Sequence, residues 1–180
     1  MKELEILKTE VHSIGRFDIV VDKLQTDGEP YPYSYVHIKE GVVVLAIYHS
    51  EIVLIKQYRH SLRSWQYEFP AGMISENEEP ENTAKRELFE ETGYTAANIK
   101  SLGWVYPSPG STTEKVHLFL AICEAHIKAC PEDSEQIEVI TVSEDCFRKM
   151  LMANEFCHGG GMAAYLKYCL GERIVNLPES

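Results

Sequence analysis

The stretch AGMISENEEPENTAKRELFEETGY, residues 71–94, decides how this chain is interpreted. It places three carboxylates, Glu87, Glu90 and Glu91, in one short segment that lies between two glycines. Like charges that are neighbours on a helix repel each other by roughly 0.2–0.5 kcal/mol per exposed pair. A cluster of this kind needs a positive partner, and we expect that partner to be a divalent metal ion.

The segment from Pro80 to Thr92 is predicted to be a helix. Pro80 suits the first turn, where its missing N–H costs nothing, and Gly93 is a natural helix stop. The three glutamates then follow an i, i+3, i+4 spacing, which puts them on one helix face. Hard oxygen ligands on one face suit Mg²⁺, with Mn²⁺ as a possible substitute. Taken alone, the spacing also fits a solvent-exposed acidic face.

The rest of the chain reads as strands with a few helices. Strand character runs over residues 11–22, and turn chemistry follows at 26–32. Two apolar runs separated by residues 49–51 indicate a hairpin. Further strands are predicted at 33–41, 65–69, 115–123 and 136–142, and further helices at 144–154 and 162–170. Many strands around few helices predict a mixed α/β (α+β) fold with prominent antiparallel hairpins.

Composition narrows the class of protein. The chain has 180 residues, 44% hydrophobic and 25% charged, which suits a globular protein with a real core. The net charge of −11 argues against a nucleic-acid partner, because broad binding to nucleic acid needs a basic surface. No apolar run is long enough to span a membrane, and MKELEILKTE at the N-terminus has no apolar signal core. We therefore expect a cytoplasmic protein without membrane contact.

The five cysteines are odd in number, and no two have the two-residue gap of a zinc or redox motif. We interpret them as reduced thiols. A zinc site made of Cys146, Cys157 and His158 is the alternative, but this spacing matches no standard pattern.

The full pattern around the helix is Gly72, five residues, Glu78, seven residues, and then Arg86-Glu87-Leu-Phe-Glu-Glu-Thr-Gly93. This pattern resembles the signature of the Nudix hydrolases at every fixed position. At a usage of about 5–7% per residue type, a chance match is on the order of 10⁻⁸ per starting point. Tyr94 departs from the pattern, because it stands where the family has an aliphatic residue, but it carries no chemistry.

The resemblance implies a fold and a domain organisation. A loop–helix–loop would lie against a mixed β-sheet that is sandwiched between helices. Residues 1–40 would form an N-terminal antiparallel β arm that contributes to dimerisation, and residues 41–180 would form the Nudix domain, with its signature at 72–94. We therefore expect a homodimer.

The resemblance also implies roles for individual residues. Glu87 and Glu91 would be the main metal ligands, Glu90 would share metal or water contacts, and the backbone carbonyl of Ala71 would be a further ligand. Supporting roles would fall to the ion pair of Glu78 with Arg86 and to the turns at Gly72 and Gly93.

Two other stretches resemble the ADP-ribose pyrophosphatase branch of this family. They are KQYRHSLRSWQYEFPAG, residues 56–72, and YPSPGSTTEKVHLFLA, residues 106–121. Arg59 offers a planar fork to a phosphate or ribose oxygen, although Glu68 could pair with it instead. Glu68 and Glu114 could accept hydrogen bonds from the ribose or the adenine. The turn at Pro109 and Gly110 would shape the substrate loop.

Two further site residues come from the same resemblance. Tyr33 aligns best with an aromatic residue that stacks on adenine, although cross-strand packing would also explain it. Glu135 matches a loop glutamate that helps to activate or position water, with Glu132 and Asp133 as rivals. Several family members carry an arginine soon after this aromatic residue, and that arginine reaches the substrate phosphates. This chain has His37 and Lys39 there instead, and neither offers the bidentate fork of an arginine. This departure leaves the identity of the substrate open.

These residues together predict a Mg²⁺-dependent hydrolase that cleaves the diphosphate of an ADP-sugar. ADP-ribose would give AMP and ribose 5-phosphate. One alternative is hydrolysis of another nucleoside diphosphate sugar, such as GDP-mannose. A second alternative is a module of the same fold that senses ADP-ribose without cleaving it, although such modules commonly lose the glutamates that are intact here.

Overall fold

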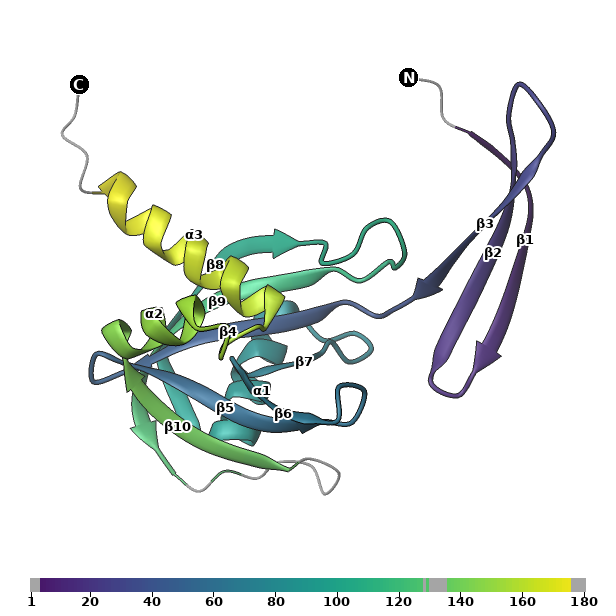
Figure 1. Ribbon diagram of the computed structural model, residues 1–180. Coiled ribbons are helices and arrows are strands. Elements are labelled where there is room, and N and C mark those ends of the chain that lie inside the picture. Colours follow the sequence, from purple (N-terminus) through teal and green to yellow (C-terminus); the bar gives the residue numbers. More distant parts are fainter. Residues whose placement is uncertain (1–3, 128, 130–135, 176–180) are drawn as a thin grey trace. The chain divides into compact units, whose positions relative to one another are not determined.

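The computed structural model describes residues 4–127, 129 and 136–175. These residues form two compact units (Figure 1). The smaller unit lies within Met1–Glu40 and Tyr106–Lys115, and the larger one within Gly41–Val105 and Val116–Ser180. Each unit is described by itself below.

The smaller unit is built on an antiparallel three-stranded sheet in the order β1-β2-β3. Its strands are β1 (Glu5–Ile14), β2 (Phe17–Gln25) and β3 (Tyr31–His37). The strand expected at 11–22 is therefore wrong as one element, because the chain reverses at Gly15, whose φ is +60°. Glycine adopts this left-handed backbone conformation without the steric cost that a side chain would add.

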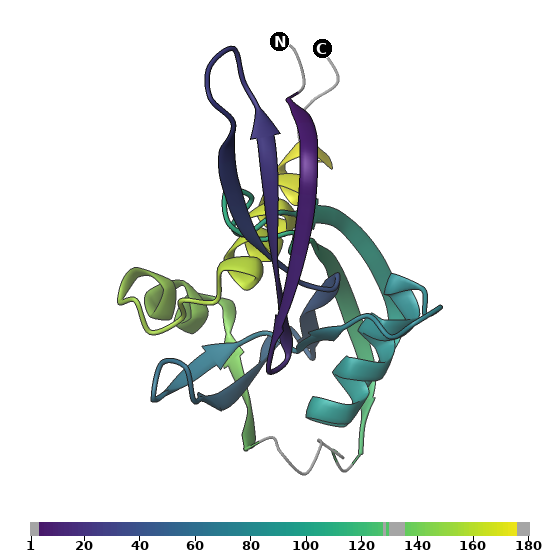
Figure 2. The ribbon, with the colours of Figure 1, turned by 90° about the vertical axis from the view of Figure 1, so that its right-hand side faces the viewer.

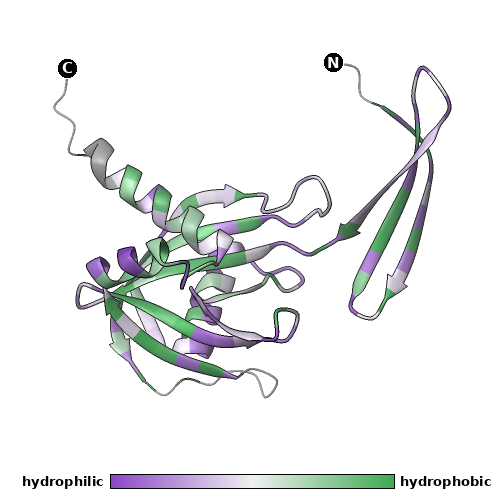
Figure 3. Ribbon diagram, in the orientation of Figure 1, coloured by the Kyte–Doolittle hydropathy of each residue, from purple (hydrophilic) through white to green (hydrophobic). Residues whose placement is uncertain are grey.

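β1 keeps its apolar side chains at the surface. Every residue of β1 is exposed, including Ile6 at 57% and Val11 at 59%, and apolar colouring runs along these strands in Figure 3. The buried polar group of this sheet is Asp22 on β2, which accepts a hydrogen bond from the Thr9 hydroxyl at 2.6 Å. Burial, with a smaller contribution from the Asp22 charge, raises the pKa of Tyr35 on the neighbouring strand.

The larger unit contains a seven-stranded sheet in the order β10-β5-β4-β9-β8, in which β6 pairs with β5 and β7 pairs with β4. β4 and β9 are parallel, whereas the other pairs are antiparallel. The strands are β4 (Gly41–Tyr48), β5 (Glu51–Arg59), β6 (Ser64–Glu68), β7 (Ala71–Met73), β8 (Tyr94–Val105), β9 (Val116–His126) and β10 (Ile137–Ser143). β8 was not predicted from the sequence.

Three helices accompany this sheet within the described residues: α1 (Pro80–Thr92), α2 (Glu144–Met152) and α3 (Gly159–Val175). The predicted bounds of α1 are confirmed. α2 ends two residues before the predicted end, and α3 is longer at both ends than predicted. The Ser143 side chain caps α2 by accepting a hydrogen bond from the backbone N–H of Cys146 at 3.3 Å. Over the part of the chain that is described, no helix has the length and apolar character needed to cross a membrane.

The core lies on both faces of the sheet. α1 packs on one face and α2 and α3 on the other, as Figures 1 and 2 show. β4 and β5 are therefore buried on both faces, and Val44, Leu45 and Leu54 have no exposed surface. Full burial of such a side chain contributes about 1.5–3 kcal/mol. The predicted mixed α/β class is confirmed, and α1 is held firmly against β4 and β7.

Candidate active site

α1 presents its three glutamates at different depths. Glu91 is only 2% exposed, the Glu87 side chain is 14% exposed, and the Glu90 side chain is 39% exposed. A buried carboxylate must be paired or hydrogen-bonded to remain charged. The partners of these side chains therefore determine what the cluster can do.

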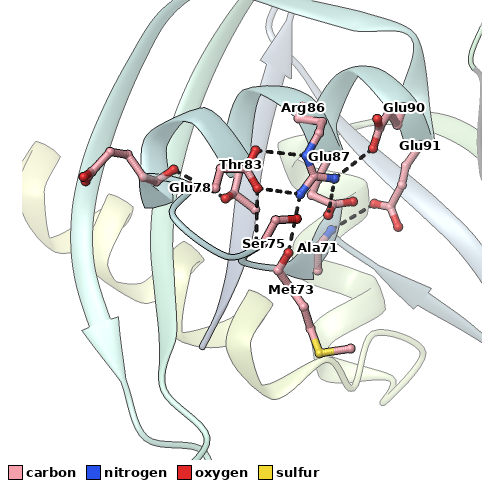
Figure 4. A network of polar contacts seen from close by, with 10 residues as sticks. Ala71, Met73, Ser75, Glu78, Thr83, Arg86, Glu87, Glu90 and Glu91 are labelled. Carbon is pink, nitrogen blue, oxygen red and sulfur yellow. Dashed lines mark hydrogen bonds and ion pairs between the residues drawn. The ribbon is translucent and has the colours of Figure 1, made fainter. Parts of the chain in front are cut away.

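The first partner is Arg86, which lies among the carboxylates in Figure 4. Its Nε and Nη2 atoms donate to the two oxygens of Glu78 at 3.0 and 2.9 Å. Its Nη1 atom donates to Glu87 Oε1 at 2.8 Å and to Glu90 Oε2 at 2.9 Å. The ion pair expected between Glu78 and Arg86 is present, and the same guanidinium also reaches two of the predicted metal ligands.

The electrostatics follow this geometry. Hydrogen bonds from Arg86 lower the pKa of Glu78 from 4.5 to about 2. The hydrogen bond to Glu78, with the contributions of Glu90 and Glu87, raises the pKa of Arg86. One guanidinium is thus shared among three carboxylates.

The second partner is the backbone of β7. Glu91 Oε2 accepts a hydrogen bond from the Ala71 N–H at 2.9 Å. Next to it, a Cβ atom on Gly72 would lie 2.0 Å from both Cδ and Oε1 of Glu87. A side chain at this position would therefore force the Glu87 carboxylate to move. At the other end of α1, Gly93 has a φ of +75°, and its N–H donates to the Phe89 carbonyl.

These residues fit a hard divalent cation. They supply carboxylate oxygens from one helix face, with the Ala71 backbone alongside, and these are oxygen donors of the type that Mg²⁺ and Mn²⁺ prefer. The space left at Gly72 holds the Glu87 carboxylate where it can serve that role. Among the described residues, no three acidic, histidine or cysteine side chains already converge as the ligands of one ion. The Nη1 atom of Arg86 instead bridges Glu87 and Glu90.

Arg59 and Glu68 pair with each other on neighbouring strands. Arg59 Nε donates to Glu68 Oε1 at 2.8 Å, and Nη2 contacts the second carboxylate oxygen. Glu68 is 7% exposed, whereas the Arg59 side chain is 40% exposed. Of the two alternatives for Arg59, the structure therefore shows the ion pair, and a contact with substrate stays a prediction.

The other predicted substrate residues all lie in the smaller unit. The Tyr33 hydroxyl donates to the Gly110 carbonyl at 2.8 Å, which ties the tyrosine to the Ser-Pro-Gly turn. The turn itself closes through hydrogen bonds to the Ser108 carbonyl from the N–H groups of Ser111 and Thr112. Pro109 belongs to this turn, and Glu114 follows it, with its N–H donating to the Thr112 hydroxyl at 3.3 Å. Tyr33 is therefore held by its hydroxyl, while the residue as a whole stays 38% exposed.

The predicted water-positioning residue Glu135, with its rivals Glu132 and Asp133, lies outside the described residues. One polar residue in the larger unit was missed from the sequence. His158, considered there only as a zinc ligand, accepts a hydrogen bond from the Phe69 N–H through Nδ1 at 3.3 Å. The three glycines that follow it are the signal that could have indicated a close backbone approach.

Comparisons with known proteins agree with this geometry. The model of the NUDIX domain family matches residues 37–154. The chain is 35% identical over 162 residues to an ADP-ribose pyrophosphatase of Bacillus subtilis (strain 168), covering 86% of this chain and 88% of that protein. It is 30% identical over 162 residues to a GDP-mannose pyrophosphatase of Cronobacter sakazakii, covering 82% and 84%.

A solved structure extends the comparison to the fold. The crystal structure of an ADP compounds hydrolase superposes with a TM-score of 0.84, covering 98% of this chain and 96% of that one. The two sequences are 20% identical over this match, so the likeness concerns the fold alone.

Proposed function

This chain belongs to the Nudix hydrolase family, and on that premise we propose that it hydrolyses the diphosphate bond of an ADP-sugar. ADP-ribose is the proposed substrate, with AMP and ribose 5-phosphate as products. The observation that carries this proposal is the similarity to an ADP-ribose pyrophosphatase over 86% of the chain. The intact set of α1 glutamates, with the space for Glu87 left by Gly72, supports turnover rather than binding alone.

The three α1 glutamates and the carbonyl of Ala71 would hold Mg²⁺, or Mn²⁺ in its place. When bound, the cation would neutralise diphosphate charge and lower the pKa of a water molecule. Arg86 orients Glu87 and Glu90, and Glu78 fixes the guanidinium in turn. The Ala71 N–H donates to the buried Glu91 carboxylate and fixes its position.

The substrate contacts are proposed for the remaining residues. Arg59 would bind a phosphate or ribose oxygen, and Glu68 would accept a hydrogen bond from the ribose or the adenine. The two side chains already pair with each other, which limits the entropy lost on binding. The ring of Tyr33, fixed through its hydroxyl, would stack on the adenine, with the turn at Pro109 and Gly110 beside it. Glu114 would accept a hydrogen bond from the nucleoside, and Glu135 would position the attacking water.

We also propose that the protein is a homodimer in the cytoplasm. The exposed apolar side chains of β1 support a partner on the smaller unit, because apolar groups gathered at a protein surface often mark an interaction site. The described cysteines, Cys123, Cys146, Cys157 and Cys169, are all free. Free thiols are the usual state in a reducing compartment.

A side-by-side turnover assay tests the proposed function. ADP-ribose, ADP-glucose, GDP-mannose and NADH are offered with Mg²⁺ and then with EDTA, and the release of AMP or GMP is measured. ADP-ribose is expected to be hydrolysed fastest, with no turnover in EDTA. Faster hydrolysis of GDP-mannose would support the second candidate, which the 30% identity to a GDP-mannose pyrophosphatase favours. Binding of ADP-ribose without any turnover would instead indicate a sensor.

A further inference from the structure

The connector between α2 and α3 packs against the segment that leads into the active site. Phe156 forms a parallel bridge with Tyr67 at the edge of β6, two residues before Phe69. The carbonyl of His158 accepts a hydrogen bond from the Met162 N–H at 2.9 Å and so opens the first turn of α3. His158 therefore lies directly before α3, with its backbone hydrogen-bonded to the first turn of the helix.

From this position the imidazole contacts the backbone of residue 69. His158 Nδ1 accepts the hydrogen bond of the Phe69 N–H at 3.3 Å. Burial is the main cause that lowers the pKa of His158 below its usual 6.5, while the nearby Glu68 raises it and Arg59 lowers it. The ring is therefore neutral near neutral pH. Because Nδ1 is the acceptor, the single ring proton belongs on Nε2.

The glycines after His158 make room for this contact. A Cβ atom on Gly161 would lie 2.6 Å from Cζ of Phe156 and 3.1 Å from Nδ1 of His158. A Cβ atom on Gly160 would lie 3.1 Å from Cγ2 of Val43. Side chains at these two positions would push α3 away from β4 and the ring away from the Phe69 N–H. The sequence of this connector is thus adapted to a close approach of His158.

The segment that His158 contacts carries several site groups. Glu68 precedes Phe69 and pairs with Arg59, and the Pro70 carbonyl accepts a hydrogen bond from the Val44 N–H at 2.9 Å. Ala71 follows, with its N–H bonded to Glu91. The Phe69 N–H lies in the middle of this run, and its partner in the structure is His158. Without that acceptor, a polar group in the interior would lose its hydrogen bond.

We propose that His158 is a positioning residue of the active site, which holds the backbone at Phe69 and thereby sets Glu68 toward the substrate and Ala71 toward the metal-binding glutamates. This assignment rests on the proposed function for its effect on catalysis. The contact itself does not, because it is a property of the folded chain. His158 does not touch the reacting atoms and acts only through the 68–71 segment.

Three substitutions separate the hydrogen bond from the bulk of the ring. In His158→Asn, the amide oxygen is as many bonds from Cα as Nδ1 is, so the acceptor is kept. In His158→Gln, the acceptor oxygen lies one bond further from Cα, at the position of Nε2. In His158→Leu, the side chain has a similar size but no hydrogen-bond acceptor. Gln is the matched control for Asn, because both carry the same amide group.

The asparagine variant is expected to keep kcat/KM within about 3-fold of the unmodified enzyme, whereas Gln and Leu should lower it by about 10-fold or more. The loss should come mainly from a higher KM for ADP-ribose and a higher Mg²⁺ concentration at half-saturation. A purely structural role would lower the melting temperature of the Gln and Leu variants. In assays run well below that temperature, it would leave the KM for ADP-ribose and the half-saturating Mg²⁺ concentration unchanged. That result would overturn the proposal.

A second measurement is independent of turnover. Long-range ¹H–¹⁵N correlation of the unmodified protein should show the His158 proton on Nε2 and a bare Nδ1, and amide exchange at Phe69 should be slow and become faster in the Leu variant. A proton on Nδ1, or unchanged exchange at Phe69, would overturn the contact. If no ADP-sugar is hydrolysed, the proposed function fails, while these two readouts still decide whether His158 holds the segment.

Discussion

The Glu87 carboxylate occupies the space in which residue 72 would carry its Cβ atom, because that atom would lie 2.0 Å from Glu87 Cδ. A side chain at residue 72 would therefore displace the Glu87 carboxylate. β7 and α1 are in contact at a second point, because the N–H of Ala71, the residue before Gly72, donates a hydrogen bond to Glu91. A change at Gly72 acts directly on a predicted metal ligand.

Gly72→Ala is expected to displace the Glu87 side chain and lower kcat by at least about 100-fold, since small misplacements at a reacting centre have effects of this size. Steady-state kinetics with a Mg²⁺ titration would measure it, alongside circular dichroism to monitor the fold. Gly171→Ala is the matched control, because a Cβ atom there would meet nothing within 4 Å. Equal kcat in the two variants would contradict the role of Glu87.

Glu91→Gln is expected to lower turnover by orders of magnitude while the fold stays intact. The amide oxygen can still accept the Ala71 N–H, so the buried contact is kept and only the charge is lost. Even outer-shell partners of metal ligands are worth about 10–100-fold, and a direct ligand should be worth more. Near-normal kcat in this variant, at an unchanged melting temperature, would remove Glu91 from the predicted metal site.

Tyr33→Ala is expected to raise the KM for ADP-ribose with little change in kcat. Stacking of a base on an aromatic ring contributes about 1–3 kcal/mol, which corresponds to a rise of roughly 5- to 150-fold. Tyr33→Phe keeps the ring and loses only the hydrogen bond to Gly110, so its KM should rise less. An unchanged KM in the alanine variant would show that Tyr33 does not bind the substrate.

The ion pair of Glu78 with Arg86 predicts a pH dependence of stability. The pKa of Glu78 is lowered from 4.5 to about 2, so its stabilisation is fully present above 4.5 and is lost as the pH falls through 2. Glu78→Gln should therefore unfold at lower urea concentration than the unmodified protein near neutral pH. The difference should shrink as the pH falls from 4.5 toward 2, and a constant difference would contradict this assignment.

The exposed apolar residues of β1 predict an effect on assembly. The double substitution Ile6→Lys and Val11→Lys is expected to convert a dimer into a monomer, because charge on the strand opposes burial against a partner. Light scattering after size-exclusion chromatography would measure the mass. Lys8→Ala on the same strand serves as a control and should stay dimeric. A monomeric unmodified protein would contradict the proposed homodimer.

The parts that were predictable from sequence depend on local signals. Pro80 and Gly93 mark the two ends of α1, and both act within one helical turn, so its bounds were predicted correctly. β8 was missed because residues 94–105 mix alanine, asparagine, lysine and glycine, and the strand depends on its pairing with β9 through several register shifts. No local signal gives that pairing.

In the candidate site, too, local features were predictable from the sequence and contacts between distant residues were not. The spacing of the α1 glutamates predicted that they share a face. The contact of Arg86 with Glu90 also follows an i, i+4 spacing, but its contact with the adjacent Glu87 depends on the side-chain rotamers. His158 and Phe69 are separated by 89 residues, so their hydrogen bond arises only from tertiary packing. For Arg59, the sequence left two partners open. The β5–β6 register places Ser64, not Glu68, opposite Arg59, so the ion pair with Glu68 depends on the side-chain conformation of Arg59.

The parallel pairing of β4 with β9 has a consequence for the order of events in folding. It sets Gly41 opposite Val116, so the intervening chain, which includes α1, must close as one long loop. Pairings between distant segments form late, because the loop entropy is lost before the contacts form, whereas a helix forms within microseconds. During refolding, the helical signal of α1 should thus return before β7 meets it, and enzymatic activity should lag behind secondary structure.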